Sequence, residues 1–131
     1  MDKGLIDTSV VIDWDDADVI ARLPDEVALS SITLAELATG PHLTGDPAER
    51  ARRQARLQQA ESLFDPISFD RAAARSYGEV VAAVIATGRK HRPRVADLLI
   101  AAVAHANGLA LHTRNPSDFS GLEQLITVEP V

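Results

Sequence analysis

The chain has 131 residues, 46% of them hydrophobic and 24% charged, and it contains no cysteine. This length suits one compact domain, and the composition is too apolar for a disordered chain. The lack of cysteine excludes disulfides, thiolate catalysis and cysteine-ligated zinc, and no apolar run approaches the length of a membrane span. We therefore expect a single domain over residues 1–131 that works in the cytoplasm without membrane attachment.

Apolar runs, helix formers and Gly or Pro residues alternate along the chain, which predicts strands alternating with helices. In chain order, the pattern predicts a strand at 4–6, helix 10–23, strand 27–30, helices 32–40 and 48–64, a short strand near 67–68, helices 70–87 and 93–107, and strands at 109–113 and 125–129. Such alternation is typical of a parallel sheet covered on both faces. The fold class expected is a three-layer α/β/α sandwich with a central, mainly parallel sheet of about five strands.

Four acidic residues each follow a predicted strand or open a helix beside one: Asp7, Glu36, Asp97 and Asp118. Each also has a structural explanation. Asp7 suits a helix cap, Glu36 forms a T-x-x-E capping box with Thr33, Asp97 suits the positive end of a helix dipole, and Asp118 suits a turn. Because the carboxyl ends of parallel strands meet at one edge of a sheet, we expect the four carboxylates to converge there.

Clustered carboxylates repel one another unless a cation neutralises them. Oxygen ligands alone suit Mg²⁺ or Mn²⁺, which keep several bound waters. Such ions activate water for attack on a phosphodiester and stabilise the charge on the leaving oxygen. The acidic set therefore predicts a metal-dependent phosphodiester hydrolase, with Glu36 as the first candidate to accept the proton of the attacking water.

These motifs resemble those of the PIN-domain ribonucleases, and more closely the VapC-type toxins of bacterial VapBC toxin–antitoxin pairs. LIDTSVVIDW resembles the first motif, with Asp7 as a metal ligand and Thr8 and Ser9 as the accompanying hydroxyls. SSITLAELATG is similar to the second, which carries Glu36, and RVADLLIAAVAHANG to the third, which carries Asp97. LHTRNPSDF resembles the closing motif, with Thr113 as its hydroxyl.

The closing motif departs from the family at one position. Many members have an aspartate two residues after the threonine, where this chain has Asn115, so Asp118 is the nearest available carboxylate. Asp118 is predicted as the fourth metal ligand, with hydrogen bonding by Asn115 as the alternative. The resemblance also implies a homodimer, dependence on Mg²⁺ or Mn²⁺, an RNA substrate and a small cognate antitoxin of the VapB type.

The net charge of −6 by itself argues against an RNA partner, but the positive side chains are clustered along the sequence. Eight of the 13 Lys and Arg fall in two stretches, Arg50 to Arg56 and Arg89 to Arg94. We expect RNA contacts from the second stretch, which precedes Asp97, and from Arg114. The predicted substrate contacts are thus Arg89, Lys90, Arg92, Arg94, Arg114, Thr8, Ser9, Thr113 and Asn115. Trp14 is predicted to pack on the first helix.

Two other classes of enzyme or signalling protein place acids at strand ends, and a third alternative is a protein without catalysis. A receiver-type signalling domain should carry a lysine near the site, whereas this chain has only Lys3 and Lys90. An aspartyl phosphatase normally has a second aspartate shortly after the first, and here the residue two positions after Asp7 is Ser9. A catalytically silent protein that binds RNA or a partner remains open, since Asn115 is what a decayed site would show.

Overall fold

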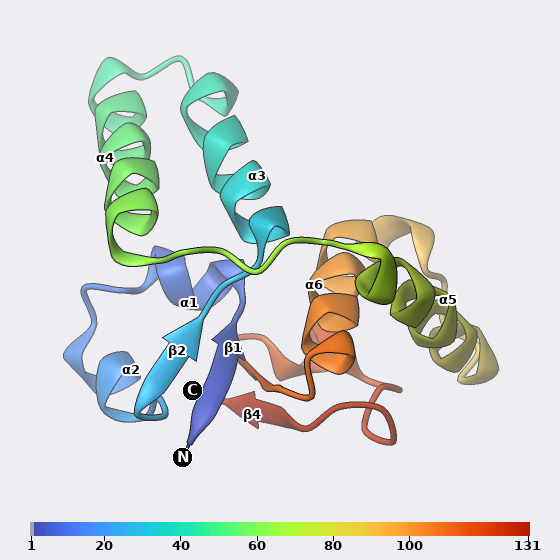
Figure 1. Cartoon of the computed structure of the whole chain (residues 1–131). Coiled ribbons are helices and arrows are strands. Elements are labelled where there is room, and N and C mark those ends of the chain that lie inside the picture. Colours follow the sequence, from blue (N-terminus) through green and yellow to red (C-terminus); the bar gives the residue numbers. More distant parts are fainter. Residues whose placement is uncertain (1) are drawn as a thin grey trace.

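The computed structural model describes residues 2–131 and has a sheet of four parallel strands at its centre (Figure 1). The strands are β1 (Lys3–Ile6), β2 (Glu26–Ala28), β3 (Ala110–Thr113) and β4 (Val128–Pro130), in the order β2-β1-β3-β4. The expectation of about five strands is wrong by one. Ile67 makes only an isolated bridge with Ser30, because the preceding Pro66 has no N–H to extend the pairing.

The helices are α1 (Thr8–Ile12), α2 (Ala17–Ala21), α3 (Ser31–Thr39), α4 (Pro47–Leu63), α5 (Arg71–Ala86) and α6 (Val95–Ala106), with 3₁₀ turns η1 (Gly40–Leu43), η2 (Arg92–Arg94) and η3 (Pro116–Phe119). The helix predicted over 10–23 is two helices. Asp16 starts the second one by accepting a hydrogen bond from the Asp18 N–H at 2.9 Å, a favourable N-cap. No helix within residues 2–131 has both the length and the apolar character needed to cross a membrane.

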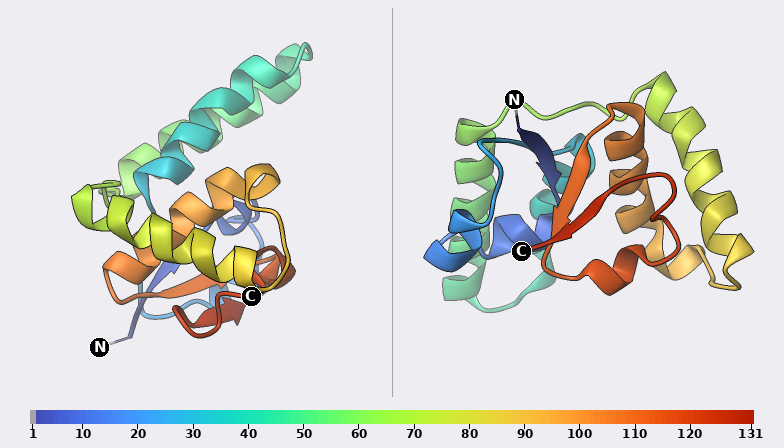
Figure 2. Two further views of the ribbon diagram at one scale, coloured as in Figure 1. Left: turned by 90° about the vertical axis from the view of Figure 1, so that its right-hand side faces the viewer. Right: turned by 90° about the horizontal axis from the view of Figure 1, so that it is seen from below.

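Helices cover both faces of the sheet, which confirms the three-layer α/β/α expectation (Figure 2). Successive residues of a strand point to opposite faces, so Leu5 joins one buried cluster and Ile6 the other. The first cluster is closed mainly by α5 and α6, and the second by α1 and α2 with the foot of α4. The strands are thereby fixed between two apolar layers, and their carboxyl ends open at one edge.

Helices α3 and α4 form a hairpin that rises away from the sheet, here called the helical arm (residues 31–63; Figure 1). The chain leaves and returns to the sheet at one place. The Ser31 N–H donates to the Ile67 carbonyl, and the Ile67 N–H to the Leu29 carbonyl, each at 2.9 Å. Of the 17 residues of α4 only Ala60 is buried, so the arm is attached at its foot and exposed along its length.

Candidate active site

Asp7 lies at the carboxyl end of β1 and is only 4% exposed. It caps α1, because one carboxylate oxygen accepts the Val10 N–H at 3.3 Å. Ser9 donates to the same oxygen, and Thr113 donates to the other at 2.6 Å. Burial raises the pKa of Asp7 above its usual value, while hydrogen bonds from Ser9 and Thr113 oppose that rise. The capping role and a metal-binding role are therefore compatible in one side chain.

Glu36 lies in the interior of α3, and the capping box predicted for it with Thr33 is wrong. The N-cap of α3 is Ser30, whose hydroxyl accepts the N–H groups of Ile32 at 3.1 Å and Thr33 at 3.3 Å. Helix α3 therefore begins earlier than the T-x-x-E pattern implied. Glu36 instead accepts a hydrogen bond from the Thr8 hydroxyl at 2.6 Å, which turns its carboxylate towards the start of α1.

Asp97 lies in the first turn of α6 and shows most directly that the acids converge. Its pKa is raised to about 6, first by burial and then by the negative charges of Asp118, Glu36 and Asp7, against a lowering effect of Arg94. The other three acids therefore act electrostatically on Asp97, as expected for acids gathered at one edge of the sheet.

Asp118 lies in η3, where Arg94 holds it. One guanidinium nitrogen of Arg94 donates to the Asp118 carbonyl at 2.9 Å and lies 3.5 Å from its carboxylate. Asn115 precedes η3 and makes no side-chain cap; its N–H donates to the Thr113 hydroxyl at 3.0 Å. Asp118 is therefore the acid of this loop that acts on Asp97, whereas Asn115 contributes a backbone contact.

The predicted hydroxyl residues bind the acids. Thr8 donates to Glu36, while Ser9 and Thr113 donate to Asp7. Ser9 also accepts the Arg114 N–H at 3.0 Å, which ties β3 to α1. These hydroxyls orient the carboxylates, and their contact with a substrate stays a prediction.

The predicted basic contacts divide into tethered and free side chains. Arg89 donates to the carbonyls of Ser117 and Ser120 at 3.2 and 3.4 Å. Arg114 binds Asp13 at 2.9 Å and the Val131 carbonyl at 2.7 Å. Lys90 and Arg92 are exposed and line a shallow groove of about 330 Å³. Arg89, Arg94 and Arg114 therefore hold loops of the protein, and only Lys90 and Arg92 of this set are free to meet a ligand.

The donor set suits a hard divalent cation, because every candidate ligand is a carboxylate oxygen and the acids repel one another. Within residues 2–131, no group of three or more acidic or histidine side chains is placed so that it could hold a metal ion. Mg²⁺ commonly uses one or two carboxylates and completes its shell with water and substrate phosphate. Two ligands, Asp7 and Asp97, with Glu36 and Asp118 as further acids, fit that type of coordination.

Arg56 and Trp14 lie in grooves beside this cluster, and the sequence did not select either as a site residue. The sequence signal that could have identified Arg56 is the helical spacing of charged residues along α4. Glu49, Arg52, Arg53 and Arg56 recur at intervals of three and four residues, which places them on one face of the helix.

Comparison with known proteins identifies the family. Residues 4–122 match the PIN domain family. Ribonuclease VapC8 of Mycobacterium tuberculosis (strain ATCC 25618 / H37Rv) is 41% identical over 101 residues, which cover 77% of this chain and 89% of that protein. Ribonuclease VapC5 of the same strain is 34% identical over 128 residues, covering 96% and 92%.

Solved structures share the fold. The VapBC-5 crystal structure, from the VapBC family of toxin–antitoxin systems of Mycobacterium tuberculosis, has a TM-score of 0.84 at 33% identity and covers 100% of this chain and 98% of its own. DNA-bound VapBC from Salmonella typhimurium has a TM-score of 0.80 at 26% identity, covering 99% and 98%. The chain therefore belongs to the PIN-domain family, among its VapC-type members.

Proposed function

We propose that the chain is a Mg²⁺- or Mn²⁺-dependent endoribonuclease, the toxin component of a type II toxin–antitoxin system. The observation that carries the proposal is the buried acid Asp97, whose pKa is raised to about 6 by burial first and then by the charges of Asp118, Glu36 and Asp7. Relatives named ribonucleases support RNA as the substrate. The reaction proposed is hydrolysis of RNA phosphodiester bonds by a metal-activated water.

Each acid has an assigned task. When bound, the metal screens the phosphate charge and lowers the pKa of a bound water. Asp7 and Asp97 would hold the ion, with Thr113 and Ser9 fixing the orientation of Asp7. Asp118 would complete the set from η3. Thr8 holds one oxygen of Glu36, and the second oxygen is the atom that we assign to accept the proton of the water.

The proposal includes the protein's assembly. Structures titled as VapBC complexes support a small antitoxin of the VapB type as partner, and we keep the homodimer that the family resemblance implies. The family match over residues 4–122 supports treating 1–131 as one PIN domain. The proposed site of action is the cytoplasm, where the RNA substrates are.

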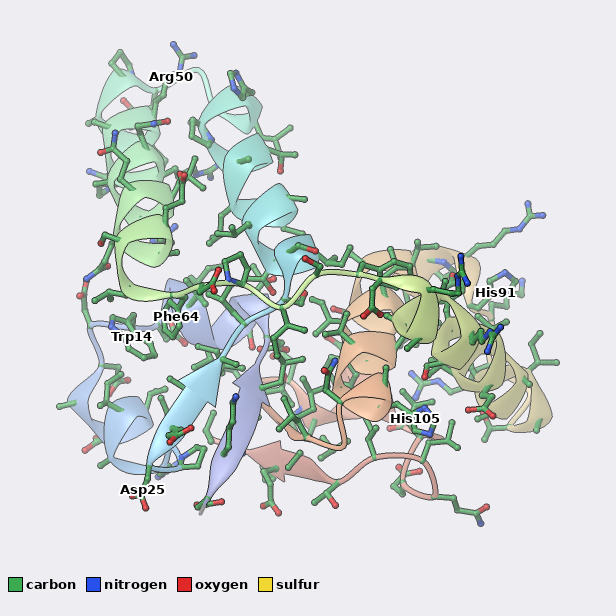
Figure 3. The ribbon with its side chains drawn as sticks, in the orientation of Figure 1. Trp14, Asp25, Arg50, Phe64, His91 and His105 are labelled. Atoms are coloured by element: carbon green, nitrogen blue, oxygen red, sulfur yellow. The ribbon has the colours of Figure 1, made fainter. Side chains whose placement is uncertain are left out.

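The test is cleavage of a panel of structured RNAs by the purified chain, with Mg²⁺, with Mn²⁺ and with EDTA. We expect metal-dependent products, and a loss of at least about a hundredfold in Asp7→Asn and in Asp97→Asn, since each removes a charge that holds the ion. Asp25→Asn is the matched control, because Asp25 is exposed beside the amino end of β2 (Figure 3). Absence of product from every RNA, or equal activity in all three variants, would overturn the proposal.

A catalytically silent PIN-like protein that binds RNA or a partner is the second candidate. It is favoured by Asn115, which stands where the family resemblance places an aspartate. The same assay separates the two functions. A silent protein shifts RNA in a gel without cutting it, with or without metal, and its binding is insensitive to Asp97→Asn.

A further inference from the structure

Two adjacent grooves lie along α4 beside the acid cluster. The first, of about 330 Å³, is lined by Thr8 and Glu36 and also by Arg53 and Arg56. The second, of about 410 Å³, is lined by Arg56 and Trp14. Both grooves share Arg56 and Ile12, which is 50% exposed. We call the two adjacent grooves together the α4 groove.

The charges of the α4 groove leave one cation without a partner. Glu49 is bound by Arg52 at 2.7 Å and by Arg53 at 3.2 Å, and these arginines lower its pKa. Arg53 also donates to the Gly40 carbonyl at 2.9 Å. Within residues 2–131 the half-buried residue Arg56 has neither a side-chain hydrogen-bond partner nor an ion-pair partner. Its guanidinium is therefore free to bind an anionic ligand.

An aromatic ring lies at the far end of the same groove. Trp14 is the only tryptophan of the chain and is half-buried. It packs edge to face against Phe64, with ring centroids 5.6 Å apart (Figure 3). Asp15 is exposed beside it and is the only acid of the groove besides Glu36 and Glu49. The three arginines of the groove are thus balanced by three acids, and Arg56 is the arginine that no acid pairs. An unpaired cation and a fixed aromatic ring in one groove can bind single-stranded nucleic acid, because a base stacks on the ring while the cation holds the backbone.

We propose that the α4 groove binds the single-stranded RNA segment that leads into the acid cluster, with Arg56 on a backbone phosphate and Trp14 under a flanking base. The assignment rests on the ribonuclease activity proposed above. It adds the helical arm to the RNA contacts expected from the 89–94 loop, where Arg89 and Arg94 are bound to carbonyl groups of the 117–120 segment and Lys90 and Arg92 are exposed.

The experiment measures binding of a labelled single-stranded RNA dodecamer of mixed sequence to the full chain by fluorescence anisotropy. Mg²⁺ is present, and the Asp97→Asn background keeps the strand uncut. Arg56→Gln should lower the slope of log Kd against log salt concentration by about 0.7, the value for one phosphate contact on a single strand. The matched control is Arg75→Gln, an exposed arginine on α5, which should leave the slope unchanged.

Trp14 supplies a second readout. RNA should quench the fluorescence of this single tryptophan, and a duplex of the same sequence should not. Trp14→Leu should weaken Kd by about fivefold or more, the effect of losing one stacked base. Because Trp14 also packs against Phe64, folding of this variant is checked by circular dichroism. The Arg56→Gln slope decides the proposal if the Trp14 variant does not fold.

The outcomes separate this proposal from the nuclease proposal. Equal slopes for Arg56→Gln and Arg75→Gln, with no quenching, would overturn the α4 groove even if the unmodified chain cuts RNA. Binding as predicted by a chain that cuts nothing would support the groove and overturn the nuclease. If Arg56→Gln weakens capture of a partner protein while RNA affinity is unchanged, the groove is a protein-docking surface and the RNA assignment is wrong.

Discussion

Helices α6 and α4 both lie beside the acid cluster but are built in opposite ways. Six of the 12 residues of α6 are buried, whereas one of the 17 residues of α4 is. Helix α6 fixes Asp97 from inside the core, while α4 offers arginines on an exposed arm (Figure 1). A metal ligand needs a position held to a fraction of an ångström, whereas contact with a flexible polymer tolerates an exposed helix. The two helices therefore suit the different roles proposed for them above.

The largest expected effect tests whether the two helices differ in their share of the stability. Ile100 on α6 is fully buried, so Ile100→Ala should lower the free energy of unfolding by about 2–5 kcal/mol. Leu63 on α4 is 55% exposed, and Leu63→Ala should change it by less than about 0.5 kcal/mol. Urea denaturation at neutral pH measures the free energy of unfolding of both variants. Losses of similar size would contradict the claim that α6 contributes more to stability than α4.

The next effect concerns the charge on Asp97. Its pKa of about 6 lies above the usual 3.8, so the folded state keeps a proton that the unfolded state releases. In EDTA, this contribution is fully present below about pH 4 and is lost as the pH rises through about 6. Allowing for solvent screening of a half-buried group, the loss is on the order of 1–2 kcal/mol.

Urea denaturation in EDTA between about pH 4 and 7 measures this loss. Asp97→Asn should remove it and stabilise the metal-free protein at neutral pH, and Mg²⁺ should stabilise only the unmodified chain. A pH dependence that persists in Asp97→Asn would show that another group, such as Asp7, carries it.

A smaller effect is expected at the foot of the helical arm. Ser30 caps α3 through two backbone N–H groups, so Ser30→Ala should destabilise the protein by about 1 kcal/mol. Ser62→Ala is the control on α4, because Ser62 is exposed and donates only to the Gln59 carbonyl. Thermal unfolding of the two variants compares them, and equal Tm values would mean that the cap contributes nothing.

The smallest expected effect on stability separates a catalytic role of Glu36 from a structural one. Glu36→Gln keeps the oxygen that accepts from Thr8, so the free energy of unfolding should change by less than about 0.5 kcal/mol. Cleavage of RNA should fall sharply, since the amide cannot accept a proton. A destabilisation of about 1 kcal/mol or more would instead indicate that the contact between Glu36 and Thr8 stabilises the fold.

The sequence pattern was sufficient for the layers of the fold but not for every element. Strand and helix alternation predicts the parallel sheet, because the periods of 2 and 3.6 residues are local properties. Helix 10–23 was predicted as one because its apolar spacing continues, and the cap at Asp16 that divides it is a single side-chain contact. The strand near Ile67 was lost for a similar reason, since Pro66 limits pairing to one bridge.

The site was predictable where it depends on strand ends and unpredictable where it depends on distant partners. Asp7 and Asp97 follow from the edge of a parallel sheet. The binding partners of the arginines cannot be predicted in this way. Arg114 binds Asp13, about a hundred residues away in sequence, and Arg94 binds Asp118. Arg94 was predicted to contact RNA from its basic stretch and Arg114 from its place near the last acidic motif, and only the tertiary fold shows which cations already have partners.

The single point at which the helical arm leaves and re-enters the sheet has a consequence for divergence within the family. Because Leu29, Ser31 and Ile67 close the base of the arm, its tip can lengthen or shorten without moving a strand. Glu36 lies below the tip and keeps its contact with Thr8. Insertions between 40 and 46 would therefore alter the reach of the arm while the contact between Glu36 and Thr8 stays in place.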